Sequence, residues 1–279
     1  ARIFDGNYFV LDAKDHRVVV LDMGEHFVRQ VGRYGTGPQE FFDPTDLALG
    51  SDGALYVFEA GNKRVTVVDQ NGARVGGFSS PEVSLAIEIN SKKEIILNQP
   101  ITGSLLAVYD LYGVKKRSFG SLRTPRSGFA THGGHDDKET YNRVHITVDD
   151  SDNIYVAWWY EPRVQKYAPD GKLLWDIELI GKEVDRFKEK ARENNGYYKF
   201  NGQTVILSGI AHVASSDLTY VLFPSATLYV LNSQGKQVGI FEYPVYDIWP
   251  FNSVTATSDG RLLFTDTNQG VFSVLAPIP

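Results

Sequence analysis

The chain repeats one order of apolar and polar positions along most of its length. An apolar run leads to Asp-Gly or a polar substitute, and an alternating segment follows that ends in an acidic or polar residue. A polar corner, a second apolar segment closing in Asp or Asn, a Gly turn and a last segment complete the unit. Short alternating runs bounded by Gly, Asn and Asp predict β-strands joined by tight turns.

The clearest unit covers residues 44–78. Its first turn is Asp52-Gly53, its second strand ends at Glu59, its corner closes with Arg64, and Gly72 marks its second turn. Similar units begin near residues 5, 85, 144, 210 and 254. Each unit predicts four short antiparallel strands, which is the composition of one blade of a β-propeller.

The copies together predict an all-β fold, a six-bladed β-propeller with four-stranded antiparallel blades. A β-sandwich is the alternative, but a sandwich does not need the same order of turns and strands several times over. All-β folds of this length often form one domain, so we expect a single domain over residues 1–279. The sixth copy stops at its third strand, since residues 276–279 are few and Pro-rich, and we expect its outer strand to be missing from this chain.

Two insertions interrupt the repeat, at residues 121–142 and 180–203. Within the second, Val184, Phe187 and Ala191 recur at helical spacing while charged residues occupy the other positions. This pattern predicts a short helix between blades four and five.

Composition narrows the possible chemistry and partners. The net charge is −6 and the chain has no Cys, which excludes disulfides, thiolate nucleophiles and Cys-ligated zinc. No run of Lys and Arg suits a nucleic-acid backbone, and no apolar stretch reaches the roughly 18 residues of a membrane helix. We therefore expect neither a nucleic-acid partner nor a membrane span.

Two stretches carry a resemblance to known proteins. Residues 44–57 with Asn62-Lys63-Arg64-Val65 look like an NHL repeat, and residues 32–41 resemble the linker after the first blade in bacterial six-bladed propeller proteins. The resemblance covers nearly the whole chain and is most specific in residues 5–78 and 144–175. It implies a propeller of the kind that is common among exported proteins of Bacteroidota, mostly of unassigned activity. It therefore implies a periplasmic, cell-surface or secreted location, with the signal segment absent from this chain, and it implies little about function.

Aromatic residues gather in loops that the fold places on one face. In a propeller whose first strands line the axis, the loops between blades and those between second and third strands share a face, and both insertions fall there. Loops on a rigid ring are where binding is expected. We predict ligand contacts from aromatic side chains and from one polar residue at the mouth of an axial strand: Trp158, Trp159, Tyr160, Trp249 and Asn252. Packing of the rings against the blades is the alternative.

Three arginines, Arg17, Arg64 and Arg163, share the corner before the third strand. A guanidinium there can tie loop carbonyls or a neighbouring acid. The functional alternative is a set of cations at the channel mouth that holds a carboxylate or sulfate group.

The sequence identifies no complete metal site, although it leaves a divalent metal such as zinc or calcium open. His132, His135 and Asp136 lie in one Gly-containing loop, and His145 and His212 lie on predicted axial strands. In peptidyl-amidating lyases, which are NHL-like propellers, a metal-ligand His is similar in position to His145, but the rest of that family's pattern is missing here. A hydrogen-bonded lining role is the alternative for His145. We expect His16 and His26, at a corner and a turn, to be solvated.

Two functions follow from these residues. The first is an exported binding propeller that recognises a small molecule, glycan or peptide, or a protein partner, through its aromatic loop face around the central channel. The second is a metal-assisted lyase or hydrolase with its site at the channel mouth. We favour the binding function because the ligand set for the second is incomplete.

Overall fold

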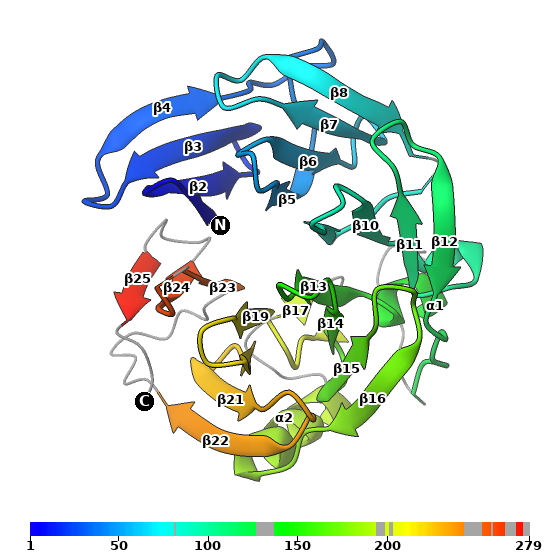
Figure 1. Ribbon diagram of the computed structural model, residues 1–279. Coiled ribbons are helices and arrows are strands. Elements are labelled where there is room, and N and C mark those ends of the chain that lie inside the picture. The colour runs from blue at the N-terminus through cyan, green and yellow to red at the C-terminus, as the bar shows by residue number, and fades with distance from the viewer. Residues whose placement is uncertain are drawn as a thin grey trace. The chain divides into compact units, whose positions relative to one another are not determined.

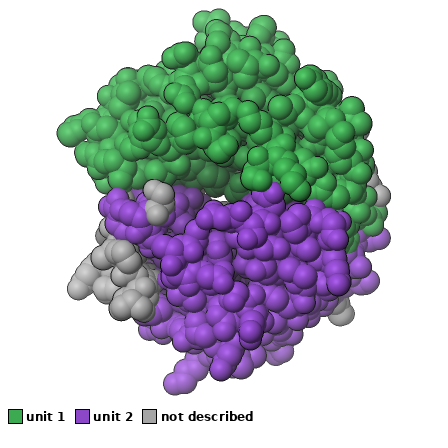
Figure 2. Space-filling view, in the orientation of Figure 1, with its two compact units in different colours: residues 1–120 green, residues 121–279 purple. Residues whose placement is uncertain are grey.

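The computed structural model describes residues 1–80, 82–126, 137–193, 199–200, 203–242, 253–257, 259–265 and 272–275. The chain divides into two compact units, residues 1–120 and residues 121–279, which Figure 2 colours separately. Each unit consists of antiparallel sheets whose strands follow one another in sequence order (Figure 1).

The first unit has three four-stranded sheets in its described residues. A 3₁₀ turn, η1 (Pro100–Thr102), lies in the third sheet's second hairpin. The strands of the three sheets, in order, are β1 (Arg2–Phe4), β2 (Asn7–Asp12), β3 (Arg17–Asp22) and β4 (Phe27–Val31); β5 (Pro44–Leu49), β6 (Leu55–Glu59), β7 (Arg64–Val68) and β8 (Arg74–Ser79); and β9 (Ile87–Ile89), β10 (Ile95–Asn98), β11 (Leu106–Tyr109) and β12 (Lys115–Phe119).

The second unit continues the same plan. It has two four-stranded sheets, a sheet with three described strands and a small hairpin. Its strands are β13 (Val144–Val148), β14 (Ile154–Trp158), β15 (Arg163–Tyr167) and β16 (Leu173–Glu178); the hairpin β17 (Lys199–Phe200) and β18 (Gln203–Thr204); β19 (Gly209–Val213), β20 (Leu218–Leu222), β21 (Thr227–Leu231) and β22 (Gln237–Glu242); and β23 (Ser253–Ala256), β24 (Leu262–Thr265) and β25 (Phe272–Leu275).

Two α-helices, α1 (Asp137–Tyr141) and α2 (Lys182–Glu193), belong to the second unit. Helix α2 lies between the sheets of blades four and five, as predicted, and buries Val184, Phe187 and Ala191. These side chains join a core that contains residues of both sheets, including Tyr155 and Tyr229. Of the described helices, none combines the length and apolar character needed to cross a membrane.

A recurring polar turn explains why a strand in each of the first five blades is followed by or closes in Asp or Asn. The Asp69 carboxylate accepts hydrogen bonds from the backbone N–H groups of Asn71 and Ala73, at 2.8 and 2.9 Å. Side chains that bond backbone groups two and four residues ahead hold the tight turn and satisfy its donors. The same two bonds recur where the following residues take the place of Asp69: Asp22, Asn90, Asp110, Asp149 and Asn232.

The apolar core lies between successive sheets. In the first unit, Phe58 and Val65 of one sheet pack in a single cluster with Ile87 and Leu97 of the next. All four side chains are fully buried. Within each unit, similar clusters join blades one and two, four and five, and five and six. The loops at the strand ends are left to carry polar side chains.

Candidate functional site

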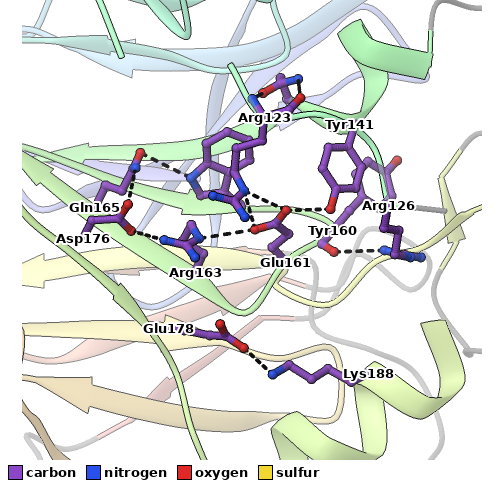
Figure 3. A network of polar contacts seen from close by, with 12 residues as sticks. Arg123, Arg126, Tyr141, Tyr160, Glu161, Arg163, Gln165, Asp176, Glu178 and Lys188 are labelled. Atoms are coloured by element: carbon purple, nitrogen blue, oxygen red, sulfur yellow. Dashed lines mark hydrogen bonds and ion pairs between the residues drawn. The ribbon is translucent and has the colours of Figure 1, made fainter. Parts of the chain in front are cut away.

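The loop side of blade four gathers polar side chains from three segments of the second unit around Glu161 (Figure 3). Arg123 Nε lies 2.8 Å from Glu161 Oε1 and the Tyr141 hydroxyl donates to the same oxygen at 2.6 Å. Arg163 Nε donates to Oε2 at 3.3 Å. Since the Glu161 side chain is only 14% exposed, its charge is matched by two guanidinium groups rather than by water.

Tyr141 acts as a donor in this cluster. Burial, together with the hydrogen bond to Glu161, raises the pKa of the Tyr141 hydroxyl well above its ordinary value. The phenol therefore keeps its proton at neutral pH and continues to donate to the carboxylate. No proton transfer is required for this arrangement, so its role is to hold the three segments together.

The backbone of Arg123 is fixed by the buried side chain of Asn142. The Asn142 Oδ1 atom accepts from the Arg123 N–H at 2.7 Å, and its Nδ2 group donates to the Arg123 carbonyl at 2.9 Å. Arg126, three residues on, donates to the carbonyls of Tyr160 and Ala191, at 3.2 and 3.1 Å. The segment that follows β12 is thereby tied both to the β14–β15 loop and to α2.

Arg123 presents donors that the fold does not use. Its side chain is 38% exposed, and its guanidinium carbon lies 6.0 Å from the centre of the Trp158 ring. In the part of the chain that the structure describes, no group accepts a hydrogen bond from its two Nη atoms. A guanidinium held through Nε beside an aromatic ring keeps its Nη edge available for a planar anion such as a carboxylate.

The predicted aromatic contacts lie mostly inside this platform. Trp158 is fully buried and its indole N–H donates to Gln165 at 3.4 Å, while Tyr160 and Trp159 are 1% and 9% exposed. Trp159 stacks on His145 with ring centres 5.1 Å apart. Of the three, Trp158 lies beside Arg123, and a direct role in contacting ligand stays a prediction for all three residues.

Each of the three corner arginines pairs with an acid of its own hairpin. Arg17 Nε lies 3.1 Å from Asp12, Arg64 Nε lies 2.7 Å from Glu59, and Arg163 bonds Glu161. Arg64 also donates to backbone carbonyls of the preceding interblade loop, those of Thr36, Gly37 and Glu40. These bonds match the structural alternative, in which the guanidinium ties loop carbonyls and acids.

The two described candidate metal ligands make separate contacts. His145 Nε2 lies 3.3 Å from the Leu207 carbonyl, and burial lowers the pKa of this imidazole to about 4. His212 Nδ1 lies 3.1 Å from the Thr219 hydroxyl, and its ring stacks on Tyr155 at 5.0 Å. Among the described residues, no group of three or more His, Asp or Glu side chains is placed to hold a metal ion.

Five predicted site residues lie outside the described residues: Trp249, Asn252, His132, His135 and Asp136. Conversely, sequence reasoning missed Arg123, Tyr141 and Glu161. The role of Glu161 could have been predicted, because Arg163 lies at a repeated corner and an arginine there needs an acidic partner in its own hairpin. Arg123 lies in an insertion with no repeat position, so the sequence carried no comparable signal for it.

Comparison with known proteins supports the architecture. Residues 1–75 match a family model described as a 6-bladed β-propeller. This chain is a six-bladed β-propeller in fold. No curated protein matches the sequence significantly.

Several solved structures are similar in fold over most of the chain. A protein of unknown function from Bacteroides caccae has a TM-score of 0.59 at 11% identity, covering 92% of this chain and 81% of its own. A candidate exported protein from Bacteroides fragilis has a TM-score of 0.61 at 10% identity, with coverages of 98% and 82%. A catalytically inactive virginiamycin B lyase from Staphylococcus aureus, solved with quinupristin, has a TM-score of 0.63 at 11% identity, with coverages of 99% and 79%. At these identities the likeness concerns fold alone.

Proposed function

We propose that this chain is an exported, NHL-type binding propeller that recognises a ligand bearing a carboxylate at the loop side of blade four. The observation that carries the proposal is the arrangement of Arg123, whose Nε is held by Glu161 while its Nη atoms donate to no described group and its side chain is 38% exposed. A guanidinium fixed before binding loses little side-chain freedom when a ligand arrives.

The surroundings of Arg123 favour recognition over catalysis. Its neighbours Glu161 and Tyr141 are engaged with one another, so neither is available to accept a proton from a substrate. The three ordered segments provide a rigid base for the adjoining insertions, as binding loops require. Export is supported by the candidate exported protein among the fold neighbours.

Titration calorimetry with two acidic probes tests the proposal. Trigalacturonate presents carboxylates on a sugar, triglutamate presents them on a peptide, and neutral maltotriose serves as the counter-probe. We expect one acidic probe to bind, with affinity that falls as salt is added, since the contact is partly exposed. Arg123→Gln should weaken that binding roughly tenfold or more, the value of one charge-assisted contact.

Arg186→Gln is the matched control, because Arg186 is also a partly exposed arginine of the second unit, and its contacts in the described part of the chain, with Glu183 and Phe187, are within its own helix. It should leave binding unchanged. If neither acidic probe binds the wild-type protein, or if Arg123→Gln binds as tightly, the carboxylate site is wrong. Stoichiometric zinc or calcium in the purified protein would instead favour the metal-assisted lyase or hydrolase.

A further inference from the structure

The loop that joins β4 to β5 in the first unit is held rigidly from beneath. The buried Glu59 carboxylate accepts from the Phe42 N–H at 3.0 Å and from Asn62 at 2.6 Å. Asn62 also donates to the Gly35 carbonyl, and Arg64 holds three further carbonyls of the loop. The loop therefore presents its outward side chains in one fixed arrangement.

Three of the rings on this loop and the neighbouring corner form one surface patch, which we call the Tyr34 patch: Tyr34, Phe42 and His16. Tyr34 and Phe42 meet edge to face with ring centres 5.5 Å apart, and His16 lies 4.9 Å from Tyr34. Tyr34 is 64% exposed, while His16 and Phe42 are partly buried beside it. A ring with a polar tip, held on a fixed loop and packed on two further rings, suits a ligand that has one apolar and one polar side.

The backbone at the patch is strained in two places. His16 has φ of 54° and Asp43 has φ of 51°, both in the left-handed region that non-glycine residues seldom adopt. The Asp43 N–H donates to His16 Nδ1 at 3.1 Å, which links the two strained residues. Seven other described non-glycine residues share this conformation, so its role here is to position the His16 ring against the loop.

That hydrogen bond also decides which His16 nitrogen carries the proton. Because Nδ1 accepts, the neutral imidazole holds its hydrogen on Nε2. Within the described residues, neither this Nε2–H group nor the Tyr34 hydroxyl has a hydrogen-bond partner. The patch thus combines an apolar ring face with two uncommitted polar groups.

We propose that the Tyr34 patch binds a neutral oligosaccharide of β-linked, equatorially substituted pyranose rings. Such rings present an apolar C–H face that stacks on an aromatic side chain, and their hydroxyls lie at the rim, where the His16 Nε2–H group donates and the Tyr34 hydroxyl donates or accepts. The site lies in the first unit and is independent of the proposed carboxylate site at Arg123.

The geometry argues against a cationic ligand. A cage for a quaternary ammonium group needs the aromatic faces to stand apart so that the cation sits between them. Here the three ring centres are only 4.9 to 6.1 Å apart and the rings pack on one another. The rings are tilted by 55° to 82° to one another, so the 64% exposed Tyr34 ring is the surface on which a single sugar ring would stack.

Titration with cellohexaose and xylohexaose, followed by calorimetry or by protein NMR shifts, tests this inference in the full chain. We expect weak binding of at least one of them, and Tyr34→Ala should reduce the affinity roughly tenfold or more. His16→Asn should reduce it less, because Asn tolerates left-handed backbone and its oxygen can replace Nδ1 as the acceptor for Asp43, while the Nε2 donor is lost.

Tyr112→Ala is the matched control, since Tyr112 is 87% exposed on a turn of the same unit and no ring packs on it among the described residues. It should bind the sugar as the wild type does. The inference is overturned if neither hexasaccharide binds the wild-type protein, or if Tyr34→Ala binds like Tyr112→Ala. Arg123→Gln should leave this binding intact, so the two sites can fail separately.

Discussion

Glu59 is completely buried, and its carboxylate lies 2.7 Å from the Nε atom of Arg64, the first residue of β7. The same carboxylate accepts hydrogen bonds from Asn62, Thr66 and the backbone of Phe42. A buried charge of this kind is tolerated only when all its partners are in place. The pair therefore joins the β6–β7 hairpin to the loop that carries the Tyr34 patch.

Removing the corner arginine should lower the free energy of unfolding strongly in blade two and only slightly in blade one. Arg64→Ala leaves Glu59 buried without its counterion, and we expect the free energy of unfolding to fall by about 3 kcal/mol. Arg17→Ala removes the equivalent arginine of blade one, whose side chain is 33% exposed, and should cost less than about 1 kcal/mol. Urea unfolding followed by circular dichroism measures both. Equal losses for the two variants would show that burial of Glu59 does not set the energy.

The repeated arginine illustrates what the sequence could predict. The corner position of Arg17, Arg64 and Arg163 follows from the repeat, and so does the need for an acid near each. In blades one and two the acid ends the second strand, as Asp12 and Glu59 do. In blade four Trp158 occupies the end of that strand and Glu161 in the turn provides the carboxylate. The acid of blade four thus lies three residues after the strand end, and the pattern of apolar residues does not reveal this displacement.

Burial at strand ends was harder to predict than the strands themselves. Every residue of β14 is buried, so the alternation that would mark its end at Trp158 is missing. His16 shows a related difficulty, since it was expected to be solvated and instead packs against Tyr34 and Phe42. Contacts between a corner and an interblade loop depend on left-handed backbone at His16 and Asp43, which a residue pattern does not reveal.

His145 should make stability depend on pH. Burial disfavours its imidazolium and lowers its pKa from 6.5 to about 4, and the Leu207 carbonyl opposes this shift only partly. The unfolded chain then binds more protons than the folded one between these values. The free energy of unfolding is therefore unaffected by this group above about pH 6.5. It falls progressively as the pH decreases towards 4, by at most about 3 kcal/mol.

Comparison of His145→Gln with the wild type at about pH 7 and about pH 4.5 isolates this contribution. The variant has no imidazole to protonate, so its unfolding free energy should decrease less on acidification. His26→Gln is the control, because the His26 side chain is 82% exposed. A wild-type pH dependence that His145→Gln leaves unchanged would mean that another group causes it.

Two adjacent glycines of β8 should respond oppositely to substitution. Gly77 has φ of 128°, and a Cβ atom there would lie 2.3 Å from the Val65 carbonyl oxygen of β7. That oxygen belongs to the backbone of the neighbouring strand and cannot move without disturbing the sheet, so Gly77→Ala should lower the free energy of unfolding by about 3 kcal/mol.

At Gly76 the added atom would meet the Val67 side chain at 3.7 Å, an ordinary contact. Gly76→Ala should therefore be neutral or stabilise by up to about 1 kcal/mol, because alanine has less freedom in the unfolded chain. Thermal unfolding of the two variants side by side checks both signs, and a Gly77→Ala protein as stable as Gly76→Ala would contradict the close approach of β8 to Val65.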